Sequence, residues 1–183
     1  MKQSLAAFFL LFVLVADLVS PLAAQVPSGK DVVAPTAYAS FDPVARGAAF
    51  QVAVIMKIRP GFHVNAREVS EDYLIRTDLH ADVPAGFKAG EVIYPKGTLQ
   101  TFSFSKNKPL NVYTDSVTLF VPVTALSDAP AGAQHLPMKL RYQACSAEIC
   151  LPPVTLNLDV PLNVAATPGA ARPAHSEVFS QRK

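Results

Sequence analysis

Hydrophobic and polar residues alternate along most of the chain between residues 50 and 160. The alternation is clearest over 50–58, where Phe50, Val52, Val54, Met56 and Ile58 occupy every second position. Side chains of an extended strand point alternately to its two faces, so this pattern predicts a strand with one buried face. Further extended segments are expected at 62–65, 73–80, 87–94, 112–113, 117–123, 138–143 and 154–160.

Turn signals separate these segments. Pro60-Gly61, Pro84-Ala85-Gly86 and Pro95-Lys96-Gly97 each follow an alternating run. No helical period is evident after residue 24. About seven short strands at this spacing predict an all-β, single-domain antiparallel β-sandwich. Pro122 falls inside one predicted strand, which indicates an edge strand or a bulge there.

The first 24 residues have the pattern of a secretory signal peptide. Lys2 supplies the positive charge, Leu5–Ala16 is an unbroken apolar run, and small residues lead to a cleavage site near Ala24. A membrane anchor is the alternative, but the run is shorter than the roughly 20 residues that span a bilayer. We therefore expect an exported protein, in a compartment where disulfides persist.

The remaining chain divides into three parts by composition. Residues 25–44 are expected to form an N-terminal lead-in, and residues 45–164 the sandwich domain. Residues 165–183, rich in Ala, Pro, Ser and charge, lack a core pattern and are expected to be a disordered tail.

Charge and motif content exclude several classes of function. The formal net charge of +2 is too small and too dispersed to argue for binding nucleic acid. The four histidines show no metal-ligand spacing with one another or with the cysteines. No glycine-rich phosphate loop is present. We therefore expect neither a metal nor another cofactor.

Cys145 and Cys150 are the two cysteines of the chain, and four residues separate them. They lie between the alternating segment that ends at Gln143 and the one that begins at Val154. Two strands joined by so short a loop form a hairpin. The cysteines would then face each other with about 4.5–5.5 Å between their Cα atoms, a spacing at which a disulfide can form.

Such a disulfide is either a structural staple or a working redox pair. A staple is the usual case in small exported domains. The chain-entropy model, however, gives only about 2 kcal/mol for so small a ring. An immunoglobulin-type staple would also join distant strands beside a Trp, and this chain has no Trp. If the alternation continues to residue 145, Cys145 shares the outward face of Arg141 and Gln143, where another thiolate can reach it.

The chain lacks the features of a self-sufficient thiol reductase. It has no Cys-x-x-Cys motif and no pattern of a strand followed by a helix N-terminus that would lower a thiol pKa. The pair is better suited to relaying electrons between two other proteins. A non-catalytic envelope binding module with a structural disulfide remains the alternative.

Several segments together resemble one protein family. Tyr142-Gln143-Ala144-Cys145 followed by Cys150-Leu151-Pro152-Pro153 resembles the signature of the N-terminal periplasmic domain of the DsbD-type thiol:disulfide interchange proteins. The same order of similar segments continues upstream: Pro60–Asn65, Asp72–Leu74, Gly86–Lys88 and Tyr94–Gly97. The resemblance covers about residues 45–162.

The resemblance implies an immunoglobulin-like sandwich and a redox-active protein-disulfide reductase-like function in the periplasm. A thioredoxin-like donor, fed by a membrane electron-transfer protein, would reduce the cysteine pair. The pair would then reduce oxidised periplasmic client proteins. By family analogy Cys150 is the attacking sulfur and Cys145 the resolving one.

The resemblance also suggests which residues surround the cysteines. A cap loop with an aromatic residue is expected over Thr98–Lys108, with Phe104 or Phe102 as that aromatic residue, unless both are ordinary core. Tyr73 and Tyr142 are expected near the site. Glu148 either shifts the local thiol pKa or is a solvated loop residue.

Two features depart from the family pattern. Some members have five residues between the cysteines, whereas this chain has four. The sequence also contains one domain, without the membrane and thioredoxin-like domains of the family. Either a separate protein is therefore expected to supply electrons, or the redox role has lapsed.

Overall fold

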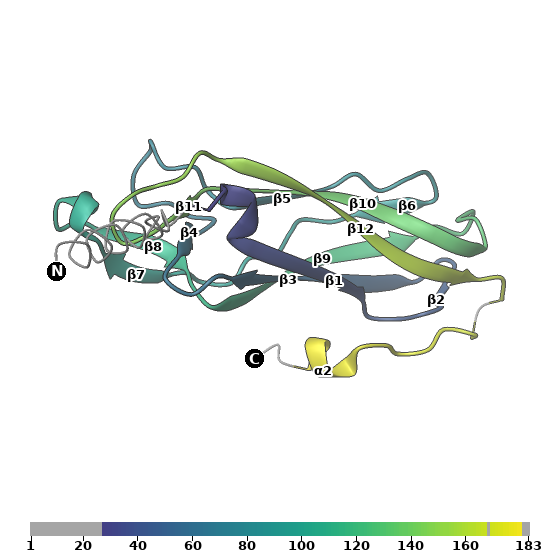
Figure 1. Ribbon diagram of the computed structural model, residues 1–183. Coiled ribbons are helices and arrows are strands. Elements are labelled where there is room, and N and C mark those ends of the chain that lie inside the picture. The colour runs from purple at the N-terminus through teal and green to yellow at the C-terminus, as the bar shows by residue number, and fades with distance from the viewer. Residues whose placement is uncertain (1–26, 168, 181–183) are drawn as a thin grey trace, which may run out of the picture.

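A computed structural model describes residues 27–167 and 169–180 (Figure 1). The predicted signal peptide and its cleavage site lie outside the described residues. Two large sheets face each other along the length of the molecule, and a smaller third sheet lies at one end. This arrangement confirms the antiparallel β-sandwich that the alternation predicts.

The first large sheet is antiparallel throughout. Its strands, in spatial order, are β1 (Val33–Ala39), β3 (Ala49–Ile58), β9 (Ser116–Ala125) and β6 (Phe87–Ala89). Pro122 lies in β9, and its carbonyl accepts a hydrogen bond from the Gly90 backbone N–H. The register beside it shifts by one residue, from Ala89↔Val123 to Ile93↔Phe120. The missing N–H of proline therefore falls at a bulge, as predicted.

The second large sheet packs against the first. Its strands, in spatial order, are β2 (Val44–Ala45), β12 (Val154–Ala165), β10 (Gly132–Tyr142) and β5 (Asp78–Ala81). The long β10–β12 hairpin pairs from Gly132↔Val164 to Tyr142↔Val154. Its closed end continues directly into the segment that contains both cysteines.

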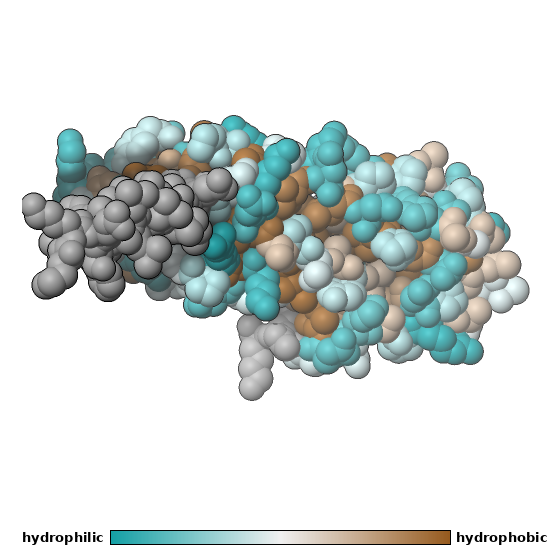
Figure 2. Space-filling view, viewed as in Figure 1, coloured by the Kyte–Doolittle hydropathy of each residue, from teal (hydrophilic) through white to brown (hydrophobic). Residues whose placement is uncertain are grey.

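The core between the two sheets is formed by the alternating positions of the predicted strands. Its fully buried members from the long strands include Val52, Val54, Met56, Leu119, Val121, Leu136, Met138, Leu140, Tyr142 and Val160. In the orientation of Figure 1, hydrophobic residues show between hydrophilic ones along the middle of the molecule (Figure 2). Burial of these side chains, each worth about 1.5–3 kcal/mol, holds the sheets together.

The small sheet has a core of its own on its second face. Its strands, in spatial order, are β11 (Ala144–Cys145), β4 (His63–Asn65), β8 (Pro109–Tyr113) and β7 (Thr98–Thr101). Buried Leu74, Leu110 and Val112 form this second cluster, against which Phe102 and Phe104 pack. The cysteine-bearing strand therefore belongs to a sheet with both faces covered.

Three segments differ from their sequence expectations. The alternating run 73–80 is a strand only from Asp78, because residues 71–74 turn and the Ile75 N–H bonds to the Gln143 side chain. The lead-in contains the 3-10 helix η1 (Gly29–Asp31) and the edge strand β1. The tail includes the short helix α2 (Ser176–Phe179), and its Pro173 forms a β-bridge with Phe41. The proline-rich composition of the lead-in and of the tail did not indicate that these two segments pair with other parts of the backbone.

No helix among residues 27–167 and 169–180 is long and apolar enough to cross a membrane.

Candidate redox site

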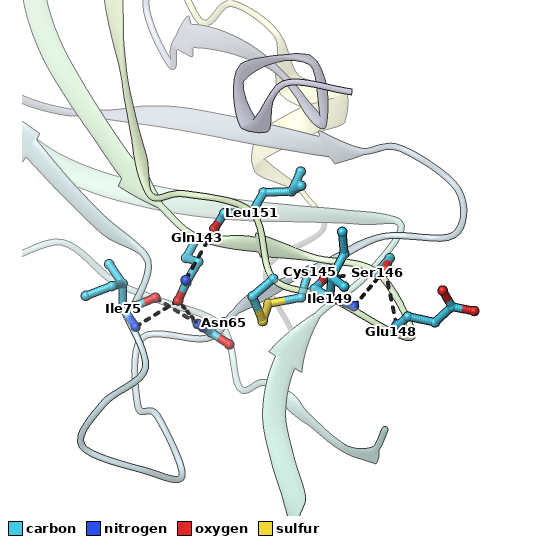
Figure 3. The surroundings of a disulfide bond; sticks show 9 residues. Asn65, Ile75, Gln143, Cys145, Ser146, Glu148, Ile149 and Leu151 are labelled. Carbon is cyan, nitrogen blue, oxygen red and sulfur yellow. Dashed lines mark hydrogen bonds between the residues drawn. A yellow bond between two sulfur atoms is a disulfide. The ribbon is translucent and has the colours of Figure 1, made fainter. Parts of the chain in front are cut away.

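Cys145 and Cys150 form a disulfide across the closed end of the β10–β12 hairpin (Figure 3). Backbone hydrogen bonds flank the pair on both sides: Leu151 N–H donates to the Ala144 carbonyl and Ser146 N–H to the Ile149 carbonyl, each at 2.8 Å. The cysteines thus occupy the narrow, non-hydrogen-bonded position of an antiparallel ladder. Their Cα atoms are 3.9 Å apart, so the wider spacing expected from the sequence is wrong.

The side chain of Ser146 organises the loop between the cysteines. Its Oγ accepts hydrogen bonds from the backbone N–H groups of Glu148 and Ile149, each at 3.2 Å. Figure 3 shows these bonds on the side of the disulfide that faces away from Gln143. The loop is therefore held by local bonds that do not involve the sulfur atoms.

The two cysteines differ sharply in exposure. Cys145 is completely buried, whereas Cys150 is exposed. The expectation that the pair faces outward is thus correct for Cys150 and wrong for Cys145. Alternation ends because the chain leaves the β10 sheet after Tyr142, and Ala144 and Cys145 then pair with β4 in the small sheet. Both of these consecutive residues are buried in consequence.

The small sheet places Cys145 directly opposite His63. Directly opposed residues of an antiparallel pair project from the same face of the sheet. Their neighbours Val64 and Ala144 are also opposed, and these two belong to the main core. His63 and Cys145 therefore share the other face.

A hydrogen-bond network of amide groups lies beside Cys145 (Figure 3). The Gln143 Oε1 atom accepts from Asn65 Nδ2 and from the Ile75 N–H, both at 3.3 Å, and Gln143 Nε2 donates to the Leu151 carbonyl. Asn65 Nδ2 also donates to the Ile75 carbonyl at 3.0 Å. This network connects both hairpin arms next to the disulfide with the turn that precedes β5.

The β7–β8 hairpin covers the same face. The connection between its strands contains the 3-10 helix η2 (Ser103–Ser105). The Phe102 ring stacks on the His63 ring with 3.9 Å between centroids, and the Phe104 ring lies beside Phe102, nearly parallel to it, with 5.5 Å between centroids. Ser103 Oγ donates a 2.8 Å hydrogen bond to the Ala147 carbonyl, in the loop between the cysteines. We call residues 102–105 the cap segment; they lie within the predicted range Thr98–Lys108.

His63 has an unusual environment for a histidine. Its side chain is 3% exposed, and its Nε2 atom has no hydrogen-bond partner among the described residues. Burial lowers the pKa of His63 from 6.5 to about 4. The imidazole is therefore neutral at pH 7.

The other residues predicted near the site lie elsewhere or at its margin. Tyr142 is buried in the main core, where its hydroxyl donates to the Gly29 carbonyl at 2.8 Å and burial raises its pKa to about 12. Tyr73 is 70% exposed in the turn before β5. Glu148 is an exposed residue of the cysteine loop. The structure thus brings Phe102 close to the cysteine strand but does not place Tyr142 there.

Sequence reasoning assigned no role to His63, Asn65 or Gln143. A signal was nevertheless present, because His63 and Asn65 lie within the segment Pro60–Asn65 that resembles the family, and Gln143 lies within the cysteine signature. What the sequence did not reveal was the pairing of β4 with β11, which joins two strands about 80 residues apart.

A pocket of about 350 Å³ lies next to the cap segment. Its lining includes His63 and Phe102, Ala147 of the cysteine loop, and the charged residues Arg59 and Asp115.

The fold and site together define a class of protein: a β-sandwich with a disulfide in a short hairpin loop and an aromatic segment packed beside it. Residues 30–161 match the family model described as "Thiol:disulfide interchange protein DsbD, N-terminal". The chain belongs to this family, which is a family of thiol–disulfide exchange proteins. Membership and the sandwich architecture confirm the immunoglobulin-like fold class.

Two solved structures are similar in parts of their fold. One is the N-terminal periplasmic domain of ScsB from Proteus mirabilis, at 11% identity and a TM-score of 0.49, with 76% of this chain and 49% of that chain covered. The other is a family 123 glycoside hydrolase from Clostridium perfringens, at 10% identity and a TM-score of 0.27, with 73% and 28% covered. The chain thus spans about half of the ScsB chain. No curated protein matches the sequence.

Proposed function

We propose that this protein relays electrons by thiol–disulfide exchange through Cys145 and Cys150. One observation carries the proposal: the disulfide has one exposed cysteine, Cys150, and one fully buried cysteine, Cys145. An incoming thiolate has direct access to the first and not to the second. Family membership supplies independent support for exchange chemistry.

The reaction follows from this asymmetry. A donor thiolate attacks the Cys150 sulfur, a donor–Cys150 disulfide forms, and Cys145 leaves as a thiolate that takes up a proton. The second thiolate of the donor then attacks the donor sulfur of the mixed disulfide and releases Cys150. Two electrons have now passed to this protein, and the donor is oxidised to its own disulfide.

The reduced protein then passes these two electrons to a client protein by the reverse exchange reaction. The Cys150 thiolate attacks a client disulfide and forms a mixed disulfide with the client. Cys145 then attacks the Cys150 sulfur, which restores the internal disulfide and releases the reduced client. Cys150 is thus the attacking residue and Cys145 the resolving residue.

The cap segment would regulate access to the pair. Phe102 packs on His63, the residue opposite Cys145, and Ser103 bonds to the cysteine loop. Movement of the cap segment would uncover the face of the small sheet that carries Cys145. Phe102 is better placed than Phe104 for this role because it contacts His63 directly, whereas Phe104 lies 6.3 Å from the imidazole.

The same proposal extends to partners and location. The electron donor would be a thioredoxin-like protein supplied by a membrane electron-transfer protein, and the clients would be oxidised proteins of the periplasm. Export would depend on cleavage of the signal peptide near Ala24.

Trapping of a mixed disulfide tests the proposed function. The Cys145→Ser variant retains the exposed Cys150 and lacks the resolving thiol. It is mixed with a thioredoxin-like protein whose second cysteine is Ser and whose first cysteine carries a thionitrobenzoate group. The Cys150 thiolate should displace thionitrobenzoate and leave a stable mixed disulfide between the two proteins. The covalent complex is detected by non-reducing electrophoresis and mass spectrometry of the linked peptides.

The matched control is Cys150→Ser, which leaves the buried Cys145. We expect at least about tenfold less complex from this variant, because a buried thiol reacts slowly. Equal trapping through both cysteines, or no trapping through Cys150 in a folded protein, would contradict the proposal.

A further inference from the structure

His63 is a buried, neutral imidazole beside the cysteine that an attacking protein cannot reach. It lies opposite Cys145 in the β4–β11 ladder, and the two side chains share one face of the small sheet. Cys145 is 0% and His63 3% exposed. Opposed side chains of such a pair have Cβ atoms about 4.5–5.5 Å apart, which is within reach of a bond between an imidazole nitrogen and a thiol.

The Nε2 atom of His63 has no hydrogen-bond partner among the residues that the structure describes. A buried polar atom without a partner is costly, at about 1–3 kcal/mol, and it calls for an explanation, of which a redox or catalytic role is one. The Cys145 sulfur is bonded to Cys150 in the oxidised form and carries no proton. Reduction gives Cys145 an S–H group that can donate to Nε2.

The surroundings of the imidazole favour its neutral form. One ring face stacks on Phe102, and Cys145 is its opposed neighbour on β11. The charged residues in the adjoining pocket are Arg59, at the end of the preceding strand, and Asp115, after β8; they carry opposite charges. Burial lowers the pKa of His63 to about 4, so the imidazole is unprotonated over the physiological range and one ring nitrogen has a lone pair that can accept a hydrogen bond.

We propose that His63 accepts the proton of the Cys145 thiol when Cys145 resolves a mixed disulfide on Cys150. In this step the Cys145 S–H proton moves to Nε2 as the Cys145 sulfur attacks the Cys150 sulfur. The Cys145–Cys150 bond forms, the bond from Cys150 to the partner breaks, and the partner leaves as a thiolate. The imidazolium then releases its proton to solvent.

This role would offset the low reactivity of a buried thiol. Burial in apolar surroundings raises the pKa of a thiol and lowers its thiolate fraction, and the thiolate is the nucleophile. An adjacent base removes the need for a preformed thiolate. The inference rests on the proposed function, because it assigns a role in the second step of the exchange.

The reaction of the reduced protein with 5,5′-dithiobis(2-nitrobenzoate) separates the two steps. Cys150 attacks the reagent in a first phase whose rate depends on reagent concentration. Cys145 then attacks the Cys150 mixed disulfide in a second phase whose rate does not. Each phase releases one coloured thionitrobenzoate, so stopped-flow absorbance gives both rates from pH 5.5 to pH 8.

The informative variant is His63→Phe, which keeps an aromatic ring to stack on Phe102 and removes the proton acceptor. We expect the second phase to slow by on the order of a hundredfold near pH 6, with the first phase changed less than about twofold. The second-phase rate should be nearly independent of pH in the wild type. In the variant it should rise about tenfold per pH unit, because it then follows the thiolate fraction of Cys145.

Two further variants complete this test, one as a substitute for His63→Phe and one as a control. His63→Gln retains a hydrogen-bonding side chain that cannot take up a proton, and it should behave as His63→Phe does if the phenylalanine variant fails to fold. His135→Gln, at an exposed position of β10, should leave both phases unchanged.

The outcomes separate this inference from the proposed function. An unchanged second phase and a flat pH profile in both His63 variants would overturn the role of His63 while leaving exchange intact. Absence of the first phase in the folded wild-type protein would instead contradict the proposed function itself.

Discussion

At the scale of single residues, the site depends on the unequal exposure of two cysteines that are bonded to each other. Cys150 follows the loop and is exposed, whereas Cys145 precedes it and is buried in β11 of the small sheet. Since an attacking thiolate must approach along the S–S axis, only an accessible sulfur is attacked readily. The two thiols should therefore differ in reactivity once they are separated.

Alkylation rates of the single-cysteine variants measure this difference. We expect Cys150 in Cys145→Ser to react with iodoacetamide at least about tenfold faster than Cys145 in Cys150→Ser. The rates are measured by mass spectrometry under native conditions, and unfolding in guanidinium should bring them together. Similar native rates would show that both sulfurs are equally accessible.

A second residue-scale prediction concerns stability in acid. The pKa of His63 is lowered from 6.5 to about 4 by burial, so the unfolded chain binds a proton that the folded chain rejects. The contribution of neutral His63 to stability is thus present above pH 6.5 and is lost as pH falls toward 4. In urea unfolding at several pH values, His63→Phe should show a smaller loss over that window than the wild type and His135→Gln. An identical pH dependence of His63→Phe and wild type would contradict this.

Some site residues could be predicted from the sequence and others could not. The disulfide follows from Cys145 and Cys150 at the ends of a short hairpin loop. The burial of Cys145 does not, since it arises where the chain passes from one sheet to another and alternation fails. His63 and Asn65 became part of the site through long-range pairing, which a one-dimensional pattern does not contain.

At the scale of elements, the cap segment contacts both β4 and the cysteine loop. Phe102 stacks on His63 of β4, and Ser103 donates a hydrogen bond to Ala147 of the loop. The resemblance to the family predicted a cap within Thr98–Lys108. It did not indicate which ring contacts the site, because Phe102 and Phe104 are both aromatic and both partly buried.

Truncating the Phe102 side chain of the cap segment should accelerate reduction of the disulfide. We expect Phe102→Ala to be reduced by dithiothreitol several-fold faster than the wild type, at a loss of about 1–2 kcal/mol of stability for a partly buried ring. Leu99→Ala, at a 65% exposed position of the same hairpin, is the matched control and should change neither quantity. An unchanged reduction rate in Phe102→Ala would exclude the cap from control of access.

The tether between Ser103 and the cysteine loop can be tested separately. Ser103→Ala removes one exposed hydrogen bond, which costs about 0.5–1.5 kcal/mol at most. We expect a faster reduction in this variant with a melting temperature within a few degrees of the wild type. A large loss of stability with no change in reduction rate would instead give the bond a purely structural role.

At the scale of the whole molecule, we expect the sandwich to fold without the disulfide. The core lies between two sheets whose long strands pair along their full lengths, and the bond closes a small ring at one end. Alternation predicted these long strands well because each has one face in the core. In the small sheet the sequence indicated β4 and the end of β8 as extended segments. Alternation did not indicate their burial there, because His63, Val64 and Asn65 are all buried.

Loss of the bond should accordingly be tolerated. The chain-entropy model assigns about 2 kcal/mol to a ring of this size, so we expect the double variant Cys145→Ser, Cys150→Ser to unfold cooperatively. Its melting temperature should be lower than that of the wild type by roughly 5–10 °C. Loss of cooperative unfolding, followed by circular dichroism, would indicate that the disulfide is a structural requirement.

The reduction potential of the Cys145–Cys150 bond tests the central claim most directly. It is measured by equilibrating the protein in glutathione or dithiothreitol redox buffers, alkylating the free thiols and counting them by mass spectrometry. A redox relay requires a potential near those of exchange partners, about −200 mV, with the protein folded in both states. A potential well below about −300 mV would mark an inert structural bond and would contradict the proposed function.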